Sequence, residues 1–279
     1  MQTSKSDPFV LRLRPTSTSV ATGFRELLAH RELLFFFAWR DLKVRYKQTA
    51  LGVAWALLQP MFMMIIFSVF FGNLARVSSD GLPYPIFVYC GLLPWQLFSY
   101  ALSNAANSLV VNERLVTKVY FPRIALPIST VIAGLVDFAV AFVLLLVLMA
   151  YYRCFPSSAI VTLPYFLLLA VGAAVAVGIG LSALNVRYRD FRYTLPFLTQ
   201  AWLFATPIAY SSSLVPERWR ALYGLNPMLS VVEGFRWALL DAAPPVASTL
   251  FMSSSVVIVG LFLGFRYFLR VERSMADIV

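Results

Sequence analysis

Six long, continuous runs of apolar residues organise the chain. The runs lie at residues 51–71, 84–110, 125–151, 161–184, 194–210 and 246–265. About 20 apolar residues are enough for one helix to cross a bilayer, so each run is a candidate span. None of them shows the two-residue alternation that is typical of a membrane β-strand. The pattern therefore predicts an all-α integral membrane protein with six transmembrane helices.

Residues 22–50, ahead of the first run, mix apolar and charged residues with a helical period. The apolar positions recur at steps of three and four residues, at Phe24, Leu27, Leu28, Leu34, Phe35, Ala38 and Leu42. This spacing predicts an amphipathic interface helix on the inner membrane surface, preceded by a flexible cytoplasmic tail at residues 1–21. The last four cations of the helix either anchor it or bind an anionic head group where substrate enters. These cations are Arg40, Lys43, Arg45 and Lys47.

A shorter apolar segment, SVVEGFRWALLD, interrupts the regular pattern between runs five and six. It has only about a dozen residues and contains two charges, which is typical of a re-entrant or interfacial segment rather than a span. We expect two short re-entrant helices within residues 214–242 that form an outer gate, and we expect the two charged residues, three positions apart, to pair. The residues assigned to this gate are Trp219, Asn226, Pro227, Glu233 and Arg236.

Lysine and arginine are distributed unevenly between alternate connecting segments. Of the 279 residues, 60% are hydrophobic, the mean hydropathy is +0.76 and the formal net charge is +10. The N-terminal segment, the second and fourth connections and the C-terminal end together carry 18 Lys and Arg, against 5 in the alternate segments. The positive-inside rule then places both termini in the cytoplasm. A basic total in so apolar a chain does not indicate nucleic-acid binding.

Two basic turns on the inner side are candidates for contact with a cytoplasmic partner. The first, NERLVTKVYFPRIALP at residues 112–127, contains Glu113, Arg114, Lys118 and Arg123. Its two prolines predict a short helix that stops before the third span. The second turn, NVRYRDF, contains Arg187, Arg189 and Asp190. The alternative for both is an ordinary positive-inside loop.

Two features inside the runs depart from plain apolar sequence. Asp137 is the one acidic residue in any run, and a carboxylate in a span costs about 2.5–3.5 kcal/mol on insertion scales. It either belongs to a transport pathway or bonds to a neighbouring helix, and the lack of a second intramembrane acid or histidine favours the structural role. Gly172, Ala176 and Gly180 predict close helix packing, within one subunit or at a dimer seam.

Residues suited to catalysis or metal binding are scarce. The chain has one histidine, His30, and it has no H-E-x-x-H, G-x-S-x-G or phosphate-loop motif. Cys90 and Cys154 lack the spacing of a bridge or metal site and are expected to be free thiols. The inner-face carboxylates stand among basic residues, which argues against a membrane-embedded glycosyl or acyl transferase. We therefore expect no catalytic site, no metal and no cofactor in this chain.

Six short stretches, taken together and in order, carry a family resemblance. They are RDLKVRYKQTALGVAWALLQP, GLLPWQLF, NERLVTKVYFPRIALP, NVRYRDF, ATPIAY, and LNPM followed by EGFRWALL. From about residue 35 to the C-terminus, the chain resembles the permease subunits of type-2 ABC exporters of bacterial polysaccharide, which export O-antigen, capsule and teichoic acid. The resemblance implies a homodimer of six-span subunits joined to two copies of a separate ATP-binding cassette ATPase, which holds ATP and Mg²⁺.

The same resemblance implies that a lipid-linked polysaccharide leaves through a channel at the dimer seam, across the bacterial inner membrane. The coupling element that meets the ATPase would lie at residues 112–123, including Tyr120 and Phe121, with residues 187–190, including Tyr188, as a second contact. The candidate residues for lining this channel are Trp95, Phe98, Tyr100, Trp202 and Phe204. The alternative role for these aromatic residues is packing against lipid. An exporter of small lipophilic compounds on the same scaffold is the other transport hypothesis.

Overall fold

Every element in the described part of the chain is a helix. The computed structural model describes all residues except 1–19, 48–51, 53, 189 and 273–279. The α-helices are α1 (Val20–Ala29), α2 (Arg31–Tyr46), α3 (Ala54–Phe67), α4 (Tyr84–Val111), α5 (Glu113–Lys118), α6 (Ala125–Tyr152), α7 (Leu163–Arg187), α8 (Phe191–Ala205), α9 (Glu217–Tyr223), α10 (Pro227–Leu240) and α11 (Ala247–Glu272). The π-helix η1 (Ser68–Leu74) and the 3₁₀ turns η2 (Ser158–Thr162) and η3 (Ser212–Leu214) complete the order. The predicted all-α class is confirmed.

Five helices among the described residues are long and apolar enough to cross a membrane. They are α3 with η1 (Ala54–Leu74), α4, α6, η2 with α7 (Ser158–Arg187) and α11. The predicted fifth span forms α8, which has 15 residues. At 1.5 Å per residue a helix of this size is about 22 Å long, which is less than the roughly 30 Å of the hydrocarbon core. Six transmembrane helices therefore remain a prediction.

Pro207 explains why α8 ends early. A proline pushes the residue before it into extended conformation, and Thr206 has φ −104° and ψ 139°. The chain then turns back through α9 and α10, which are separated by residues 224–226. Two short helices were predicted here with a break at Asn226 and Pro227; the structure has two helices, with Pro227 as the first residue of α10, and their re-entrant character stays a prediction. In α10, 12 of the 14 residues are buried, so this helix lies inside the bundle.

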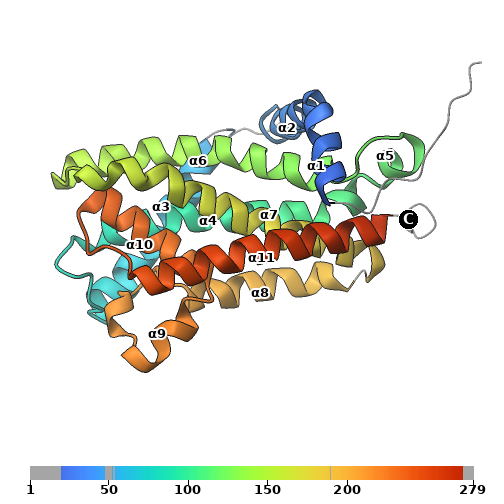
Figure 1. Ribbon diagram of the computed structural model, residues 1–279. Helices are drawn as coiled ribbons and strands as arrows, with labels where there is room; N and C mark the ends of the chain where they lie inside the picture. The colour runs from blue at the N-terminus through green and yellow to red at the C-terminus, as the bar shows by residue number, and fades with distance from the viewer. Residues whose placement is uncertain (1–19, 48–51, 53, 189, 273–279) are drawn as a thin grey trace, which may run out of the picture.

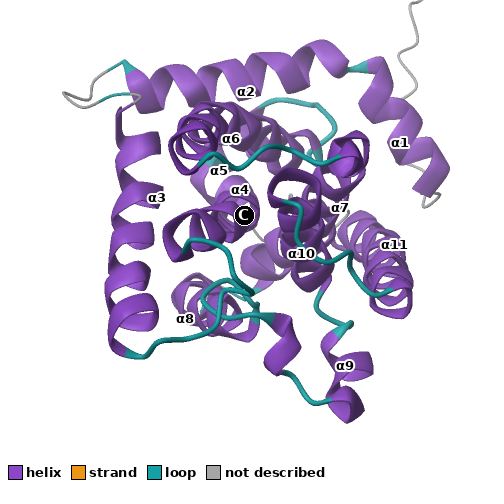
Figure 2. Ribbon diagram, turned by 90° about the vertical axis from the view of Figure 1, so that its left-hand side faces the viewer, coloured by secondary structure: helices purple, strands orange, loops and turns teal. Residues whose placement is uncertain are grey.

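The central helix of the bundle is α4, which packs against α6 and α7 and also contacts α3, α8 and α10. Figure 2 shows α4, α6, α7 and α11 nearly end-on, whereas α2 and α3 run across the view. Of the five candidate spans, α4 is the most buried and α3 the least. The α3 helix is therefore peripheral within the subunit.

The small residues of α7 pack against α11 within the same subunit. A Cβ atom on Gly264 of α11 would lie 2.6 Å from the carbonyl oxygen of Ala176, and one on Gly172 would lie 2.9 Å from a methyl of Val257. Gly180 also faces the backbone of Gly264. Small residues let helix backbones approach closely in a membrane. Of the two uses predicted for this pattern, the structure favours packing inside one subunit.

The segment at residues 22–50 forms two helices, α1 and α2, rather than the single helix that its spacing predicts. The chain changes direction at His30, so apolar residues on the two sides of the break cannot share one face (Figure 2). Leu27 and Ala38 are buried, but Phe35 is 70% exposed. Phe37, which lies off the predicted apolar face, is buried instead.

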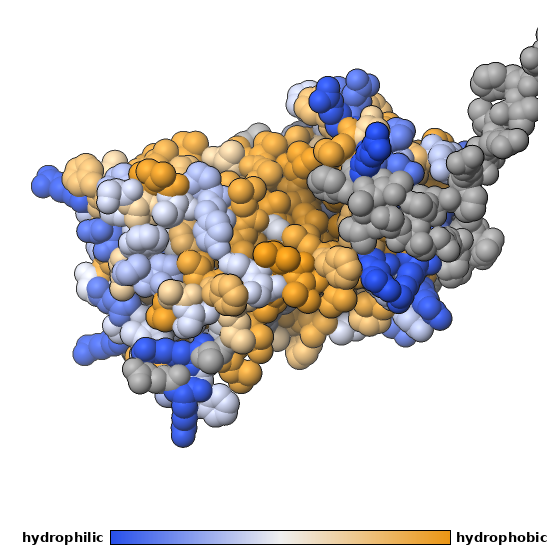
Figure 3. Space-filling model, viewed as in Figure 1, coloured by the Kyte–Doolittle hydropathy of each residue, from blue (hydrophilic) through white to orange (hydrophobic). Residues whose placement is uncertain are grey.

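The surface has an apolar band between two polar ends. Figure 3 shows this band across one face of the molecule, where α11 exposes Phe251, Ile258 and Phe262. The two basic turns that were predicted to share one side lie with α1 and the end of α11 at the right-hand end of Figure 1, and α9 and α10 lie at the opposite end. The arrangement matches that of a bundle crossing a bilayer.

Candidate functional site

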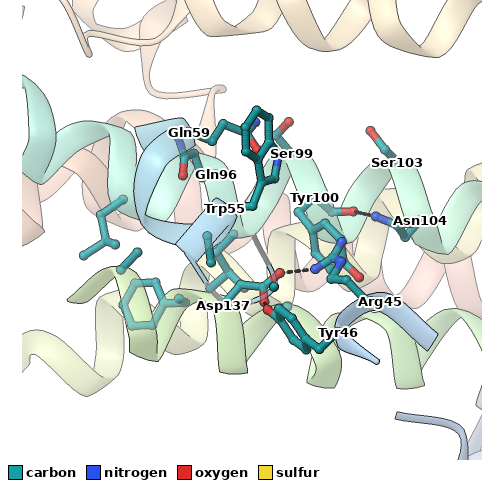
Figure 4. Close-up of a pocket in the computed structure, with 17 residues that line it drawn as sticks. Arg45, Tyr46, Trp55, Gln59, Gln96, Ser99, Tyr100, Ser103, Asn104 and Asp137 are labelled. Carbon is teal, nitrogen blue, oxygen red and sulfur yellow. Dashed lines mark hydrogen bonds and ion pairs between the residues drawn. The ribbon is translucent and has the colours of Figure 1, made fainter. Parts of the chain in front are cut away.

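A cavity of about 800 Å³ lies between α3, α4 and α6, and the C-terminal end of α2 borders it (Figure 4). Its polar side chains come mainly from one face of α4, at steps of three and four residues: Gln96, Ser99, Tyr100, Ser103 and Asn104. The α3 helix contributes Trp55 and Gln59 from the other side. Such spacing places these α4 residues on a single helix face. This face of α4 therefore forms a polar wall of the cavity inside an otherwise apolar bundle.

Several of these side chains form no hydrogen bond with the part of the chain that the structure describes. Among the described residues, no hydrogen bond is formed by the side chains of Gln59, Gln96, Ser99 or Ser103. Asn104 differs, because its amide donates to the carbonyl oxygen of Tyr100 at 2.8 Å. Polar groups at membrane depth are costly unless they find a partner or line a water-filled space. These four side chains are therefore available to water or to a polar ligand.

The inner end of the cavity carries an ion pair between α2 and α6. Arg45 pairs with Asp137, and the hydroxyl of Tyr46 donates to the same carboxylate. The Arg45 guanidinium also lies over the ring of Tyr100, 4.0 Å from its centroid. Gly134 allows this arrangement, because a Cβ atom there would lie 2.8 Å from the Tyr100 ring. Asp137 thus has the structural partner that was predicted for it.

The surroundings of Tyr46 change the pKa of its phenol. Burial, the hydrogen bond to Asp137 and the negative charge of that carboxylate raise the pKa of Tyr46 to about 12. The phenol therefore remains protonated at neutral pH and donates its hydrogen bond to Asp137. The carboxylate is held by a cation and a neutral donor, so the charges at this end of the cavity balance.

The four cations proposed for head-group binding do not form one cluster. Arg45 turns into the cavity, and Arg40 pairs with Asp41 at 2.8 Å. Arg40, Lys43 and Lys47 instead line a separate groove of about 370 Å³ with Phe36, Trp39 and Val44. Lys43 lies over the ring of Trp39, 5.5 Å from its centroid. This groove combines cations with exposed apolar side chains, a combination that suits a membrane interface.

The first basic turn divides into an exposed part and a structural part. Glu113, Arg114, Lys118 and Tyr120 are exposed, with Tyr120 84% exposed. Phe121 is buried and packs against Phe37, with 5.4 Å between ring centroids. As a result, Phe121 holds the turn against α2 and is not available to a docking partner in this structure.

Arg123 is also engaged within the subunit. Its guanidinium donates to the carbonyl oxygen of Glu272 at 2.8 Å, and its backbone N–H donates to the Glu272 carboxylate at 3.2 Å. These bonds tie the first basic turn to the end of α11. In the second basic turn, Arg187, Tyr188 and Asp190 are exposed, and Arg189 lies outside the described residues.

The two turns are also linked through the bundle. The side chain of Asn185, near the end of α7, donates to the carbonyl oxygen of Ala106 and to the side-chain oxygen of Asn107, both at 3.0 Å. Asn107 lies one turn before the end of α4, which leads directly into α5. These bonds therefore connect the ends of the two helices that lead into the two basic turns.

The aromatic residues predicted to line a channel occupy different environments. Trp95 and Phe98 are core residues, 4% and 0% exposed, and Phe98 packs edge-on against Trp202 at 4.9 Å. Both side chains therefore face the interior of the subunit in this structure, and their role in lining a channel stays a prediction. Tyr100 faces the cavity, Trp202 is half-buried, and Phe204 is 53% exposed.

At the end of the bundle that holds α9 and α10, Asn226 links the interrupted end of α8 to the start of α10. Its side-chain oxygen accepts from Trp202 Nε1 at 2.9 Å and from the N–H of Met228 at 3.0 Å. Its amide donates to the hydroxyl of Thr206 at 3.0 Å. Pro227 is buried at the first turn of α10, where its missing N–H costs no helical bond. Trp219, on α9, is 50% exposed.

Arg236 does not form the predicted ion pair with Glu233, because the ion pairs among the described residues are Arg40–Asp41 and Arg45–Asp137. The Arg236 guanidinium is buried and donates to the carbonyl oxygens of Pro207 and Ile208, each at 2.8 Å, and to that of Phe87 at 3.2 Å. The break after α8 leaves carbonyl groups without helical partners. Arg236 satisfies them, which the spacing of two charges along one helix could not reveal.

The polar wall of the cavity was not predicted from the sequence. Trp55, Gln59, Gln96, Ser99 and Ser103 were not among the candidate residues, yet they form most of its polar surface. The signal that could have found them is the recurrence of polar residues every three or four positions in the second run. Cys90 and Cys154 are free thiols, as predicted. Among the described residues, there is no cluster of three or more His, Cys, Asp or Glu that could hold a metal.

Residues 32–240 match the ABC-2 type transporter family. The chain belongs to this family. A protein of Myxococcus xanthus named O-antigen export system permease protein RfbA is 33% identical over 240 residues, which cover 85% of this chain and 92% of the relative. An RfbA of Klebsiella pneumoniae is 30% identical over 74% of this chain and 79% of its own length. The polysialic acid transport protein KpsM of Escherichia coli is 24% identical over 91% and 98%.

The family places these residues in a transport protein. This ABC-2 permease has several membrane-crossing helices, and the names of its relatives describe permeases or transport proteins. For such a protein, the polar cavity and the exposed basic turns are the features that bear on function.

Proposed function

We propose that this ABC-2 permease forms, as a homodimer, the channel through which a lipid-linked polysaccharide crosses the bacterial inner membrane. ATP hydrolysis on two copies of a separate ATP-binding cassette ATPase drives the movement. The observation that carries the proposal is the match, over 92% of its length, to an O-antigen export permease. The polar cavity of about 800 Å³ inside an apolar bundle gives independent support, since a polar polymer needs polar surface at membrane depth.

The proposed topology has six spans, with α8 as the fifth and with both termini in the cytoplasm. The 18-to-5 distribution of Lys and Arg supports this orientation. On this topology, α9 and α10 enter the membrane from the outer side as a re-entrant pair.

The proposed ATPase contact consists of the exposed residues of the two basic turns. They are Glu113, Arg114, Lys118, Tyr120, Arg187, Tyr188 and Asp190, with Arg189 added from the sequence. Both turns lie at one end of the bundle, which supports a single docking surface (Figure 1). The links from Arg123 to α11 and from Asn185 to α4 would carry a movement of this surface into the spans.

Deletion of the gene tests the proposal. We expect the deletion strain to lose one surface glycan and to accumulate the same glycan, on its lipid anchor, inside the cell. A plasmid copy of the gene should restore export, and a copy that carries a charge-reversed docking surface should not. Unchanged surface glycans with no internal accumulation would refute the proposal and would favour an exporter of small lipophilic compounds.

A further inference from the structure

The lining of the cavity between α3, α4 and α6 carries information about the charge of the exported glycan. We propose that this cavity is a subsite for an uncharged sugar residue, and that the permease selects a neutral glycan. The inference rests on the proposed function and deepens it, because it names the class of polysaccharide.

The first support is the set of side chains without hydrogen-bond partners in the described part of the chain. Gln59 and Gln96 each offer a donor and an acceptor, and Ser99 and Ser103 offer hydroxyls that can act as either. Sugar hydroxyl groups have the same dual character, so they can bond to all four side chains. Since an unpartnered amide is costly at membrane depth, occupation by a hydroxylated ligand or by water stabilises this surface.

Aromatic surface beside the polar wall is the second support. Trp55 is 55% exposed and lines the same cavity as Ser99 and Tyr100. A sugar ring has polar edges and an apolar face of C–H bonds. A cavity that sets an indole ring beside amides and hydroxyls matches both parts of such a ring.

The third support is the charge balance, which excludes an anionic ligand. The charged side chains among the described residues of the lining are Arg45 and Asp137, and these two pair with each other. Arg40, Lys43 and Lys47 line the separate groove on α2. A uronate, sialate or phosphodiester would bring a second negative charge into a low-dielectric cavity beside Asp137. The lining offers this charge no cation other than Arg45, which already pairs with Asp137, so binding it would be costly.

The size of the cavity agrees with this assignment. Its volume of about 800 Å³ falls within the roughly 300–1,000 Å³ that is typical of ligand pockets. One sugar residue with its hydration shell fits into such a space, so the cavity would hold one unit of a polymer while its neighbours continue along the channel.

The charge of the glycan can be measured in the deletion strain. The glycan that accumulates there should be purified and analysed for uronic acids, sialic acids and phosphodiesters in its repeat unit, apart from its lipid anchor. A neutral repeat unit is the expected result. An acidic repeat unit would overturn the inference while leaving the proposed function intact, whereas no accumulation at all would refute the proposed function.

Variants of the full chain test whether this cavity holds the sugar. We expect Gln96→Leu, and the double variant Ser99→Ala/Ser103→Ala, to lower surface glycan by about tenfold per permease present in the membrane. Both changes make a span more apolar, so insertion into the membrane is not impaired. The matched control is Ser255→Ala on α11, where the hydroxyl bonds to its own helix at Phe251. Full export in the cavity variants at normal permease levels would overturn the subsite.

Discussion

The ion pair between Arg45 and Asp137 joins the end of α2 to α6, and breaking it should destabilise the subunit measurably. The two side chains are 35% and 22% exposed, so the pair is neither fully buried nor fully solvated. Loss of one partner costs about 3–5 kcal/mol for a buried pair, whereas a surface pair contributes about 0–1 kcal/mol. We therefore expect Asp137→Asn and Arg45→Gln each to lower the free energy of unfolding by about 2 kcal/mol.

The double variant shows whether the two side chains act together. If the charges stabilise each other, Arg45→Gln/Asp137→Asn should cost at least about 1 kcal/mol less than the sum of the single changes. Tyr46→Phe is the matched control, because it removes one hydrogen bond to Asp137 without changing any charge. Its expected cost is about 1 kcal/mol.

Thermal unfolding of the purified full chain in detergent, followed by tryptophan fluorescence, measures these effects. A loss of 1 kcal/mol shifts the Tm of a protein of 150–250 residues by about 2–4 °C, so each single charge variant should melt about 4–8 °C lower. Strictly additive effects in the double variant would refute the coupling. Export should be measured in parallel, because an Asp137→Asn protein with unchanged Tm and no export would make Asp137 a pathway residue.

Three further predictions concern the seam, the outer end and the docking surface. Gly264→Val should lower the free energy of unfolding by about 3 kcal/mol or more, because a Cβ atom there would lie 2.6 Å from a backbone oxygen. Gly180→Ala should be tolerated, because the nearest atom to its Cβ would lie 3.9 Å away. Equal Tm values for the two variants would contradict this prediction. Arg236→Met leaves three carbonyl oxygens without their donor and should cost about 3–5 kcal/mol, measured as loss of folded protein on size-exclusion chromatography. Charge reversal at Arg114 and Lys118 should reduce co-purification of the ATPase by about tenfold with no change in Tm, and an undiminished ATPase yield would return this turn to an ordinary inner loop.

Run length and proline position predicted much of the fold. The runs that form α4 and α6 were located to within one residue, because a bilayer demands long apolar helices. The start of α11 was located equally well, but its charged last two turns lie beyond the apolar run. The early end of α8 could have been read from Pro207, since the residue before a proline avoids helical conformation. The break at His30 had no such signal, because neither glycine nor proline marks it.

The site was less predictable, because its residues are defined by packing between distant segments. Asp137 was recognised from its position alone, but its partner Arg45 lies 92 residues away and was assigned to a different role. Phe98 is as aromatic as Tyr100, and only the packing of α8 against α4 decides that Phe98 is enclosed while Tyr100 faces a cavity. Arg236 similarly acts on carbonyl groups that a break in another helix exposes.

The bonds between Arg123 and Glu272 have a practical consequence for work with this protein. They hold Glu272, at the end of α11, against the first basic turn, which is part of the proposed docking surface. A fluorescent protein or affinity tag fused there would compete sterically with the motor. Labels for microscopy or purification are better inserted at the opposite end, in the exposed loop around Gly81, where the structure leaves open space.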